Sequence, residues 1–361
     1  MRSGQSENKA LNEKEYAARK DILQSGPSNI ILCSTYKCNM SCIFCLGRGQ
    51  DPDFNCDIYK TIFENKLRRF LENATDICFT GWGEFLLWPG AADFLGYLNE
   101  HFPEANKILT TNGTPLSEAM ASKMIIGNYT VQVSLHTSDA LIHRSLTQSD
   151  FFEQIVINLD NLILLRNENS CHSRLWIVLM FLVTSLNIEN LPDFVDFAGL
   201  RGANEVFCNY ITIFLPEQIG LSCFFSPQNT NRIFDEAQKR AQRYSMRLNL
   251  PPRFGLTGGM QRESVCQAPW NTVFIDGLGN IHPCCFSGRP IGNINMDDFG
   301  AIWNGENYRE LRSCLAENRP HERCKDCYKF SSVNVNDIKS HITFRDIRAK
   351  EDIFKRLNLE A

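Results

Sequence analysis

The sequence predicts an α/β fold in which parallel strands alternate with helices, followed by a small α+β domain rich in cysteine. Two observations lead to this prediction. Short β-branched runs alternate with helical stretches over residues 28–250, and this alternation implies parallel strand–helix units. A change in composition at Pro251-Pro252 marks a domain boundary, and cysteines then flank an apolar hairpin within residues 251–330.

The elements of the first domain follow from the local periodicity of apolar residues. Strands are expected within residues 29–32, 76–84, 107–113, 130–136, 175–183 and 205–212. Helices are expected over residues 58–72, 91–102, 115–126, 150–167, 189–201 and 227–246. Residues 1–27 are expected to form a tail or a peripheral helix, and residues 331–361 a charged helical tail.

The composition is that of an ordinary globular protein. The chain has 361 residues, 43 % hydrophobic and 22 % charged, which suits one large and one small domain. Its net charge of −4 offers no basic surface for nucleic acid. The first 25 residues hold no apolar signal sequence, and no apolar run is long enough to span a membrane. Fifteen cysteines without a secretion signal indicate the reducing cytoplasm.

Three cysteines stand close together after the first predicted strand. Cys38, Cys42 and Cys45 have the spacing C-x3-C-x2-C. Thiolates bind soft metals and iron–sulfur clusters. Three cysteines leave one iron of a four-iron cluster without a protein ligand, and an open position is typical of a site that acts on a bound molecule. The alternatives are a zinc site or free thiols; structural zinc needs four ligands, and the nearby Cys33 falls in the preceding strand.

This triplet after an apolar strand resembles the signature of the radical S-adenosylmethionine (SAM) enzymes. The resemblance implies a [4Fe-4S] cluster held by the three cysteines, whose fourth iron binds the amino and carboxylate groups of SAM. It also implies that the reduced cluster cleaves SAM to a 5′-deoxyadenosyl radical, which takes a hydrogen atom from a substrate. Phe44 stands where the family places an aromatic residue against the adenine.

A glycine-rich turn follows the second predicted strand. In the family, a Gly-Gly-Glu-like motif at this point binds the amino group of SAM, and Gly81, Gly83 and Glu84 match it. Trp82 replaces a frequent glycine, and Phe85 stands where proline is common. The alternative is an ordinary turn between a strand and a helix, because short glycine motifs occur often by chance.

Single polar residues after later strands are further candidates for contact with SAM. They are Asn112 in Thr-Asn-Gly, Ser134 in the fourth strand and Asn187 after the fifth. Each of them could instead cap a strand or helix. The resemblance implies an incomplete, three-quarter (β/α)6 barrel of the TIM type, and in parallel barrels the chemistry lies at the carboxyl ends of the strands. All these residues lie at or after such ends.

The C-terminal region resembles the cysteine-rich SPASM domain, or its shorter twitch form. The similar phrases are Cys266-Gln-Ala-Pro-Trp270, Gly279 four residues before Cys284, Gly292-Asn-Ile294, Ile302-Trp-Asn304 and a Cys-x2-Cys pair. The resemblance implies one auxiliary [4Fe-4S] cluster held by Cys266, Cys284, Cys324 and Cys327. Cys285 competes with Cys284 for this role, and the Gly279 spacing favours Cys284. No cysteine follows Cys327 to hold a second auxiliary cluster, and a structural zinc ribbon is the alternative.

The resemblance leaves the substrate open, because the cofactor supplies the chemistry and the protein supplies positioning. We expect oxidation of a carbohydrate-like or aminocyclitol-like substrate, with the auxiliary cluster as electron acceptor and a flavodoxin or ferredoxin as donor. The alternatives are a peptide-modifying maturase, a sugar epimerase, and a non-catalytic electron-transfer or binding protein. No catalytic side chain is identified, and the candidates are Cys223, Cys285, His136 and Tyr210.

Overall fold

The computed structural model describes residues 3–33, 35–45, 66–169, 173–255, 265–285, 289–319, 321–324 and 336–342. Ten strands form one sheet in the order β10-β9-β8-β1-β2-β3-β4-β5-β6-β7. Six parallel neighbours follow chain order: β1 (Asn29–Leu32), β2 (Asp76–Phe79), β3 (Asn106–Thr111), β4 (Tyr129–Ser134), β5 (Trp176–Val183) and β6 (Glu205–Tyr210). All six predicted strands are therefore present.

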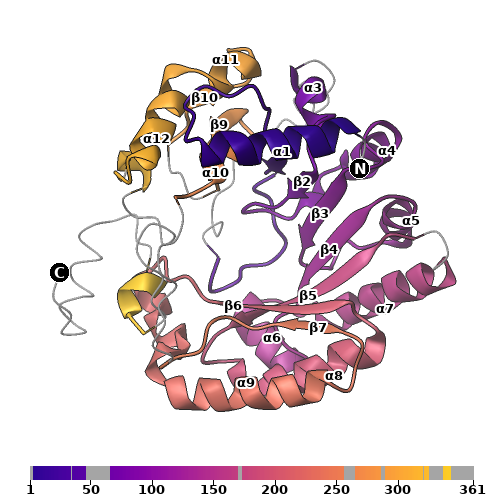
Figure 1. The fold of residues 1–361 in the computed structure, drawn as a ribbon. Coiled ribbons are helices and arrows are strands. Elements are labelled where there is room, and N and C mark those ends of the chain that lie inside the picture. The colour runs from indigo at the N-terminus through magenta and orange to yellow at the C-terminus, as the bar shows by residue number, and fades with distance from the viewer. Residues whose placement is uncertain are drawn as a thin grey trace.

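Helices connect these strands and cover the outer side of the curved sheet (Figure 1). They are α3 (Arg68–Leu71), α4 (Ala91–His101), α5 (Glu118–Ile126), α6 (Ala140–Thr147), α7 (Phe152–Glu168), α8 (Leu191–Arg201) and α9 (Pro227–Ala241). The sequence did not predict α6 or the strand β7 (Arg247–Asn249), which pairs in parallel with β6. Short 3-10 turns add η2 (Phe85–Leu87), η3 (Ile188–Asn190), η4 (Pro216–Leu221), η5 (Cys223–Phe225), η6 (Glu322–Cys324) and η7 (Ile338–His341).

Local capping explains where several helices begin and end. The side chain of Ser117 accepts a hydrogen bond from the backbone of Met120 at the start of α5. Asp139 accepts two backbone hydrogen bonds at the start of α6, and such side-chain caps satisfy donors that the helix itself leaves unpaired. Gly202 ends α8 with a φ of +83°, a conformation that glycine adopts without strain.

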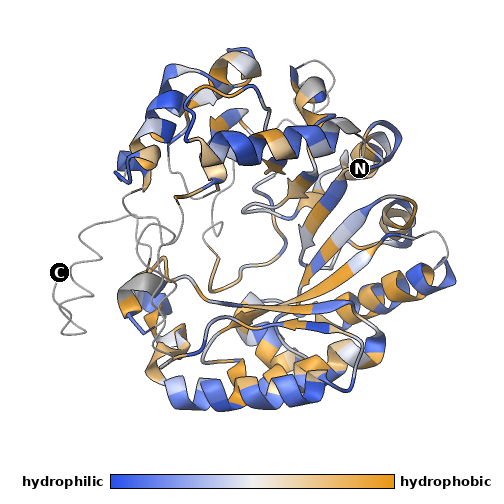
Figure 2. Cartoon of the chain, in the orientation of Figure 1, coloured by the Kyte–Doolittle hydropathy of each residue, from blue (hydrophilic) through white to orange (hydrophobic). Residues whose placement is uncertain are grey.

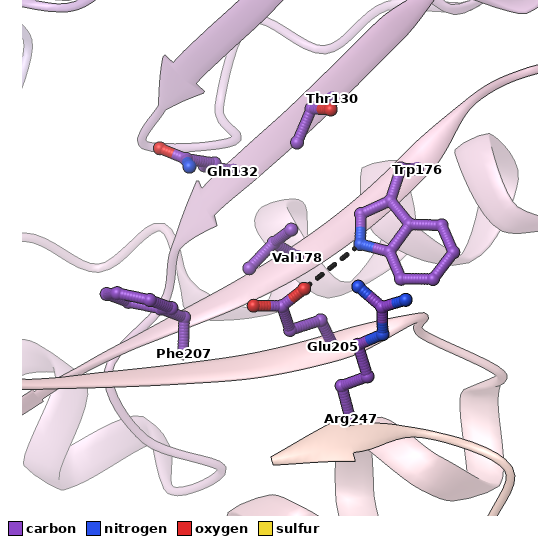
Figure 3. Close-up of a pocket in the computed structure, with 7 residues that line it drawn as sticks. All are labelled: Thr130, Gln132, Trp176, Val178, Glu205, Phe207 and Arg247. Atoms are coloured by element: carbon purple, nitrogen blue, oxygen red, sulfur yellow. Dashed lines mark hydrogen bonds between the residues drawn. The ribbon is translucent and has the colours of Figure 1, made fainter. Parts of the chain in front are cut away.

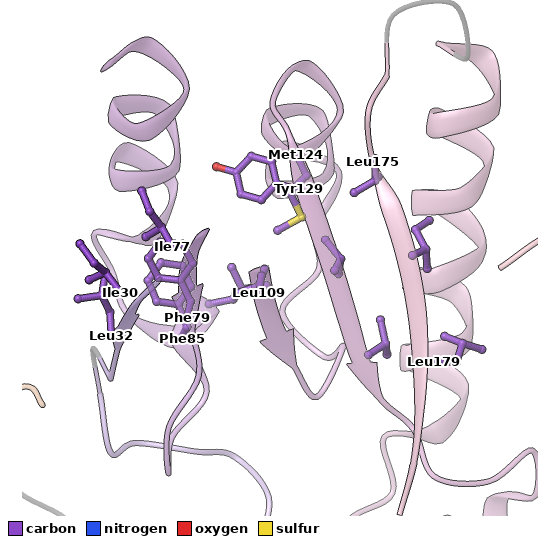
Figure 4. Close-up of a cluster of buried hydrophobic side chains, with 14 of the residues drawn as sticks. Ile30, Leu32, Ile77, Phe79, Phe85, Leu109, Met124, Tyr129, Leu175 and Leu179 are labelled. Carbon is purple, nitrogen blue, oxygen red and sulfur yellow. The ribbon is translucent and has the colours of Figure 1, made fainter. Parts of the chain in front are cut away.

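The two faces of the sheet differ in burial. Along β1 to β4, fully buried side chains alternate with half-buried ones, and the buried set packs under the helices. Figure 4 shows part of this core, with Ile30, Phe79 and Leu109 from the strands beside Met124 from α5. The opposite, inner face carries half-buried residues that are mostly polar, including Gln132. The inner face is therefore the one available to a ligand.

The hydropathy of the strands and helices agrees with this arrangement. Figure 2 shows hydrophobic residues concentrated in the strands and hydrophilic residues along much of α1 and α9. Among the described residues, no helix combines the length and apolar character that crossing a bilayer requires.

The C-terminal region continues the same sheet. The predicted hairpin is β8 (Thr272–Ile275) and β9 (Asn280–His282), which pair antiparallel, and β10 (Gly292–Asn293) follows. The strand β8 pairs in parallel with β1, with Thr272 opposite Asn29. The helices of this region are α10 (Ala268–Asn271), α11 (Phe299–Trp303) and α12 (Glu306–Ala316). The two regions predicted as separate domains thus share one sheet.

The N-terminal segment forms a helix, α1 (Ser3–Ala17), that binds to the C-terminal region. The side chain of Asn12 donates to the carbonyl of Trp270 at 2.9 Å. The indole of Trp303 donates to the carbonyl of Ser25 at 2.9 Å, and the fully buried Arg312 donates to the carbonyl of Asp21 at 2.9 Å. Two of the motif tryptophans of the C-terminal region therefore hold the start of the chain.

Candidate active site

The three clustered cysteines lie on the loop that leaves the carboxyl end of β1. Cys38 is exposed, whereas Cys42 and Cys45 are half-buried. The backbone amide of Cys45 donates to the carbonyl of Cys42 at 3.1 Å, which makes a tight turn between the last two cysteines. The pKa of the Cys38 thiol is raised mainly because the surrounding chain partly shields its sulfur from water, and the nearby charges of Glu84 and Cys45 raise it further. The loop thus brings its thiols near the strand ends.

Contacts from two helical segments, α6 and η4, hold this loop. The backbone amides of Ser41 and Ile43 donate to the carbonyls of Thr147 and Leu146, at the end of α6, at 3.1 and 2.9 Å. The side-chain amide of Gln218 donates to the carbonyl of Ile43 at 3.0 Å. Sequence reasoning missed Gln218, whose only signal is a polar residue in the apolar segment after the sixth strand.

Glu84 is buried at the carboxyl end of β2, where it is only 2 % exposed. Its carboxylate accepts hydrogen bonds from the backbone of Leu86 at 3.2 Å, the hydroxyl of Thr111 at 2.9 Å and the backbone of Asn112 at 2.6 Å. Burial raises the pKa of Glu84 to about 7, against the opposing effect of these hydrogen bonds. A carboxylate offers about four acceptor positions, so one remains for a further donor.

The glycines before Glu84 allow the turn to pack against the cysteine loop. A Cβ atom on Gly81 would lie 2.4 Å from the sulfur of Cys33, and one on Gly83 would lie 2.2 Å from the carbonyl oxygen of Thr35. Both distances are far shorter than van der Waals contact. The two glycines therefore act through close backbone packing, and this packing places Glu84 beside the loop.

Asn112 connects Glu84 to the cysteine loop. Its backbone amide donates to the Glu84 carboxylate, and its side-chain amide donates to the side-chain oxygen of Asn39 at 2.8 Å. The same side-chain nitrogen lies 3.8 Å from the sulfur of Cys38. The side-chain oxygen of Asn112 accepts from the backbone and hydroxyl of Thr114. This residue is thus positioned to set the distance between the carboxylate and the first thiol.

Phe44 and His136 meet at the carboxyl end of β4. Their rings pack edge to face with centroids 5.2 Å apart. His136 has a φ of +65°, and its Nδ1 atom accepts a hydrogen bond from the backbone of Leu182 at 3.1 Å. Burial lowers the pKa of His136 to about 4, with a further contribution from His143, so the ring is neutral near pH 7. Because Nδ1 accepts, the ring proton lies on Nε2.

Asn187 holds the backbone of His136 against that of Leu182 in β5. It is fully buried, and its side-chain amide donates to the carbonyls of His136 and Leu182, both at 2.8 Å. Its side-chain oxygen accepts from the backbone and hydroxyl of Thr184. This uses the full hydrogen-bonding capacity of the amide, so the geometry favours a positioning role for Asn187 over direct contact with a ligand. Ser134, the last residue of β4, is half-buried on the inner face.

Two weak catalytic candidates, Cys223 and Tyr210, have the properties of structural residues. Cys223 is 1 % exposed in η5, and burial raises the pKa of its thiol to about 11. A thiol with such a pKa is not a reactive thiolate near pH 7. The hydroxyl of Tyr210 donates to the carbonyl of Pro252 at 2.9 Å, and its ring packs against Phe254 and His341.

The predicted auxiliary ligands are placed in part. Cys266, Cys284 and Cys324 are half-buried and Cys285 is exposed, whereas Cys327 lies outside the described residues. No three His, Cys, Asp or Glu side chains of the described part of the chain converge as a single metal ion requires. An iron–sulfur cluster makes no such demand, because each thiolate can bind a different iron of the cluster.

The neighbouring cysteines Cys284 and Cys285 have different electrostatic neighbours. Cys284 contributes to the raised pKa of Tyr308 in α12, whose main cause is burial. Cys285 instead acts on Cys78, on the inner face of β2, where burial, Asp76 and Cys285 together raise the thiol pKa to about 12. Cys284 thus lies toward the C-terminal helices and Cys285 toward the inner face of the sheet.

A row of aromatic rings joins the cysteine loop to the C-terminal hairpin. Tyr36 stacks on Trp82 with ring centroids 5.5 Å apart, and Trp82 meets Phe274 of β8 at 6.4 Å. Phe274 meets His282 of β9 at 5.6 Å, two residues before Cys284. Trp82, the departure from the expected glycine motif, is therefore one residue that links the two cysteine regions.

Comparison with known families agrees with both cysteine regions. A family model described as the radical SAM superfamily matches residues 32–198, and one described as an iron–sulfur cluster-binding domain, SPASM, matches residues 266–328. The chain belongs to the radical SAM superfamily. As a radical SAM enzyme with a SPASM domain, it uses SAM, a SAM-binding [4Fe-4S] cluster and auxiliary iron–sulfur binding. The predicted partial barrel followed by a small domain is confirmed.

Similar proteins include a maturase and a protein whose structure holds a bound precursor peptide. The mycofactocin maturase MftC of Mycolicibacterium smegmatis is 24 % identical over 319 residues, covering 82 % of this chain and 74 % of its own. The structure of SuiB of Streptococcus suis bound to S-adenosylmethionine has a TM-score of 0.66 at 17 % identity, covering 94 % of this chain and 81 % of SuiB. SuiB bound to its precursor peptide SuiA has a TM-score of 0.64 at 16 % identity, covering 95 % and 80 %. At sequence identities of 16–17 %, the similarity to SuiB shows a shared fold alone.

Proposed function

We propose that this radical SAM enzyme modifies a peptide. The similarity to the maturase MftC, which extends over 82 % of this chain and 74 % of MftC, is the observation that carries the proposal. The fold similarity to SuiB with its bound precursor peptide is consistent with it. This favours the peptide-modifying alternative over the carbohydrate or aminocyclitol oxidation that the sequence led us to expect. The sugar epimerase gains no support from these relatives.

The residues that would hold SAM and its cluster fit these groups. Cys38, Cys42 and Cys45 share one loop near the strand ends, and Glu84 keeps one acceptor position free for an amino group. Phe44 adds an aromatic ring on the same loop, between Cys42 and Cys45. When bound, these groups supply the one-electron chemistry that removes a hydrogen atom from the substrate.

The protein's own contribution is to hold these side chains in place. Asn112 fixes the loop relative to Glu84, and Asn187 fixes the backbone of His136 behind Phe44. Since His136 is neutral and carries its proton on Nε2, it can donate a hydrogen bond but has little tendency to take up a proton near pH 7. An ammonium group beside Glu84 would favour the ionised carboxylate and lower its pKa again.

The auxiliary cluster would be held by Cys266, Cys284, Cys324 and Cys327. The half-buried position of Cys284, against the exposed position of Cys285, supports Cys284 as the ligand, as does its spacing from Gly279. We assign Cys285 no role as a ligand. A flavodoxin-type or ferredoxin-type electron donor stays a prediction.

The first test is anaerobic reconstitution with iron and sulfide, followed by dithionite and SAM. We expect 5′-deoxyadenosine from the native protein and none from a variant with Cys38, Cys42 and Cys45 all changed to alanine. The matched control is Cys208→Ala, which removes a buried thiol of the core and should leave the reaction unchanged.

The substrate class is tested next with synthetic peptides. Their sequences are taken from short open reading frames next to the gene of this enzyme. A SAM-dependent change in peptide mass, located to one residue by fragmentation, is the expected result. If no such peptide changes mass while a sugar or aminocyclitol is oxidised in the same assay, the peptide assignment is wrong.

A further inference from the structure

A pocket of about 450 Å³ lies on the inner face of the sheet, between β4 and β7 (Figure 3). Its walls include Gln132 of β4, Trp176 of β5, Glu205 and Phe207 of β6, and Arg247 of β7. None of these residues belongs to the cysteine loop or to the turn that carries Glu84. The pocket therefore lies apart from the groups proposed to hold SAM.

The pocket brings opposite charges together without pairing them. The guanidinium of Arg247 lies over the indole of Trp176, 4.9 Å from the ring centroid. Glu205, opposite Arg247 in the strand register, instead accepts hydrogen bonds from the indole of Trp176 at 3.1 Å and the side chain of Asn249 at 2.5 Å. Within the described residues, the Arg247 side chain has no ion pair or hydrogen bond.

A second donor faces the same space. The side-chain oxygen of Gln132 accepts from the hydroxyl of Thr110 at 2.9 Å, which leaves the amide nitrogen of Gln132 as a donor on the pocket wall. The planar guanidinium of an arginine matches a carboxylate with two parallel hydrogen bonds, and stacking on an aromatic ring fixes its orientation. Arg247 and Gln132 thus offer donors, while two hydrogen bonds already engage the carboxylate of Glu205.

We propose that this pocket is a substrate subsite that binds an acidic side chain of the peptide. The proposal rests on the peptide-modifying function proposed above. The Arg247 guanidinium pairs with the acidic group, Gln132 donates a further hydrogen bond, and the rings of Trp176 and Phe207 contact its methylene groups.

The position of the pocket along the strands sets the distance between the acidic residue of the peptide and the residue that is modified. Thr130 lines the pocket four residues before Ser134, the last residue of β4. At about 3.3 Å per residue, this places the pocket roughly 13 Å below the strand ends. An extended peptide covers the same distance with about four residues. The acidic residue should therefore lie about four residues from the residue that is modified.

The test measures binding by the reconstituted protein with SAM. The probes are fluorescein-labelled nonapeptides of alanine, serine and glycine with one central glutamate, glutamine or lysine, followed by fluorescence anisotropy. We expect the glutamate peptide to bind about tenfold more tightly than the other two, in line with a charge-assisted hydrogen-bonded pair. Arg247→Gln should remove this preference. Glu205→Gln should strengthen binding of the glutamate peptide, because it removes a repulsive charge.

Arg232→Gln is the matched control, since Arg232 lies on α9 in a surface ion pair with Glu189, outside the pocket. Circular dichroism confirms that each variant is folded. Equal binding of the three peptides would overturn the subsite. A preference for the lysine peptide that Glu205→Gln weakens would also overturn it, in favour of a cationic group. If none of the peptides binds, the subsite is rejected, whereas the proposed function is still judged separately by the peptide mass change.

Discussion

The backbone amide of Asn112 donates a 2.6 Å hydrogen bond to the buried carboxylate of Glu84. The side chain of the same asparagine reaches Asn39 and lies 3.8 Å from the sulfur of Cys38. One residue at the end of β3 therefore connects the end of β2 to the cysteine loop after β1. The site therefore depends on the register of three neighbouring strands. Variants of Asn112 and Glu84 should show which residue positions the loop and which binds a ligand.

Replacing Asn112 with alanine should loosen the cysteine loop without removing a cysteine. The backbone hydrogen bond to Glu84 remains, whereas the side-chain link to Asn39 is lost. We expect the affinity for SAM to fall by about tenfold, the order of one or two lost hydrogen bonds, with the iron content unchanged. Isothermal titration with SAM and an iron assay measure both. Asn112→Asp should lower the affinity for SAM further than Asn112→Ala, because it brings a negative charge to the thiol of Cys38. Equal affinities of the two variants would contradict the prediction.

Glu84 should make the protein without SAM less stable as the pH rises. Its folded pKa of about 7 lies above the ordinary value of 4.5, mainly because of burial. The folded state thus binds its proton more tightly than the unfolded state, so stability falls between about pH 4.5 and 7 and is constant above that range. A shift of this size corresponds to about 3 kcal/mol. Glu84→Gln should lack this dependence in urea unfolding at a series of pH values; parallel curves for the two proteins would refute the prediction.

Gly83→Ala should disrupt the contact between the glycine turn and the cysteine loop. The added Cβ would lie 2.2 Å from the carbonyl oxygen of Thr35, a backbone atom that cannot move away alone. We expect a loss of about 1–3 kcal/mol in the free energy of unfolding and reduced iron binding. Gly220→Ala is the matched control, because a Cβ there meets no atom within 4 Å. Equal stability of the two variants in thermal unfolding would show that the packing is not tight.

Gln218→Glu should make the cysteine loop less stably held, because it removes the side-chain nitrogen that donates to the carbonyl of Ile43. It keeps the side-chain oxygen that accepts from the backbone of Phe214 and Leu215. An ionised glutamate cannot make the bond to Ile43, and leaving a buried acceptor unpaired costs about 1–3 kcal/mol. We expect faster amide hydrogen exchange at Ile43 and Cys45 than in the native protein. Unchanged exchange at these two residues would mean that Gln218 stabilises only its own turn and not the cysteine loop.

The sequence allowed the six main strands and both cysteine regions to be predicted, because these depend on local patterns. The strand β7 was missed since its three residues, Arg247–Asn249, show no apolar alternation. The helix α6 was missed although Asp139 supplied a capping signal. The roles of Gln218 and Asn187 could not be predicted, because one partner of each, Ile43 and His136 respectively, lies far away in sequence and is brought close only by the fold.

The pocket at Trp176 illustrates the same limit. Its residues on β4 to β6 have buried neighbours along the strand, as expected for a sheet with one covered face, and no local motif marks the pocket. Only the parallel pairing of β4 to β7 brings Gln132, Glu205 and Arg247 to one place.

The pairing of β1 with β8 has a consequence for the order of events during synthesis. Asn29 and Thr272 are 243 residues apart in sequence, yet they lie opposite each other in neighbouring strands. At about 5–20 residues per second, roughly 10–50 s separate the appearance of the two strands on the ribosome. During this interval β1 presents an unpaired edge of the kind that promotes aggregation. The nascent chain should therefore need protection by chaperones until synthesis has passed β8, about three quarters of the way along these 361 residues.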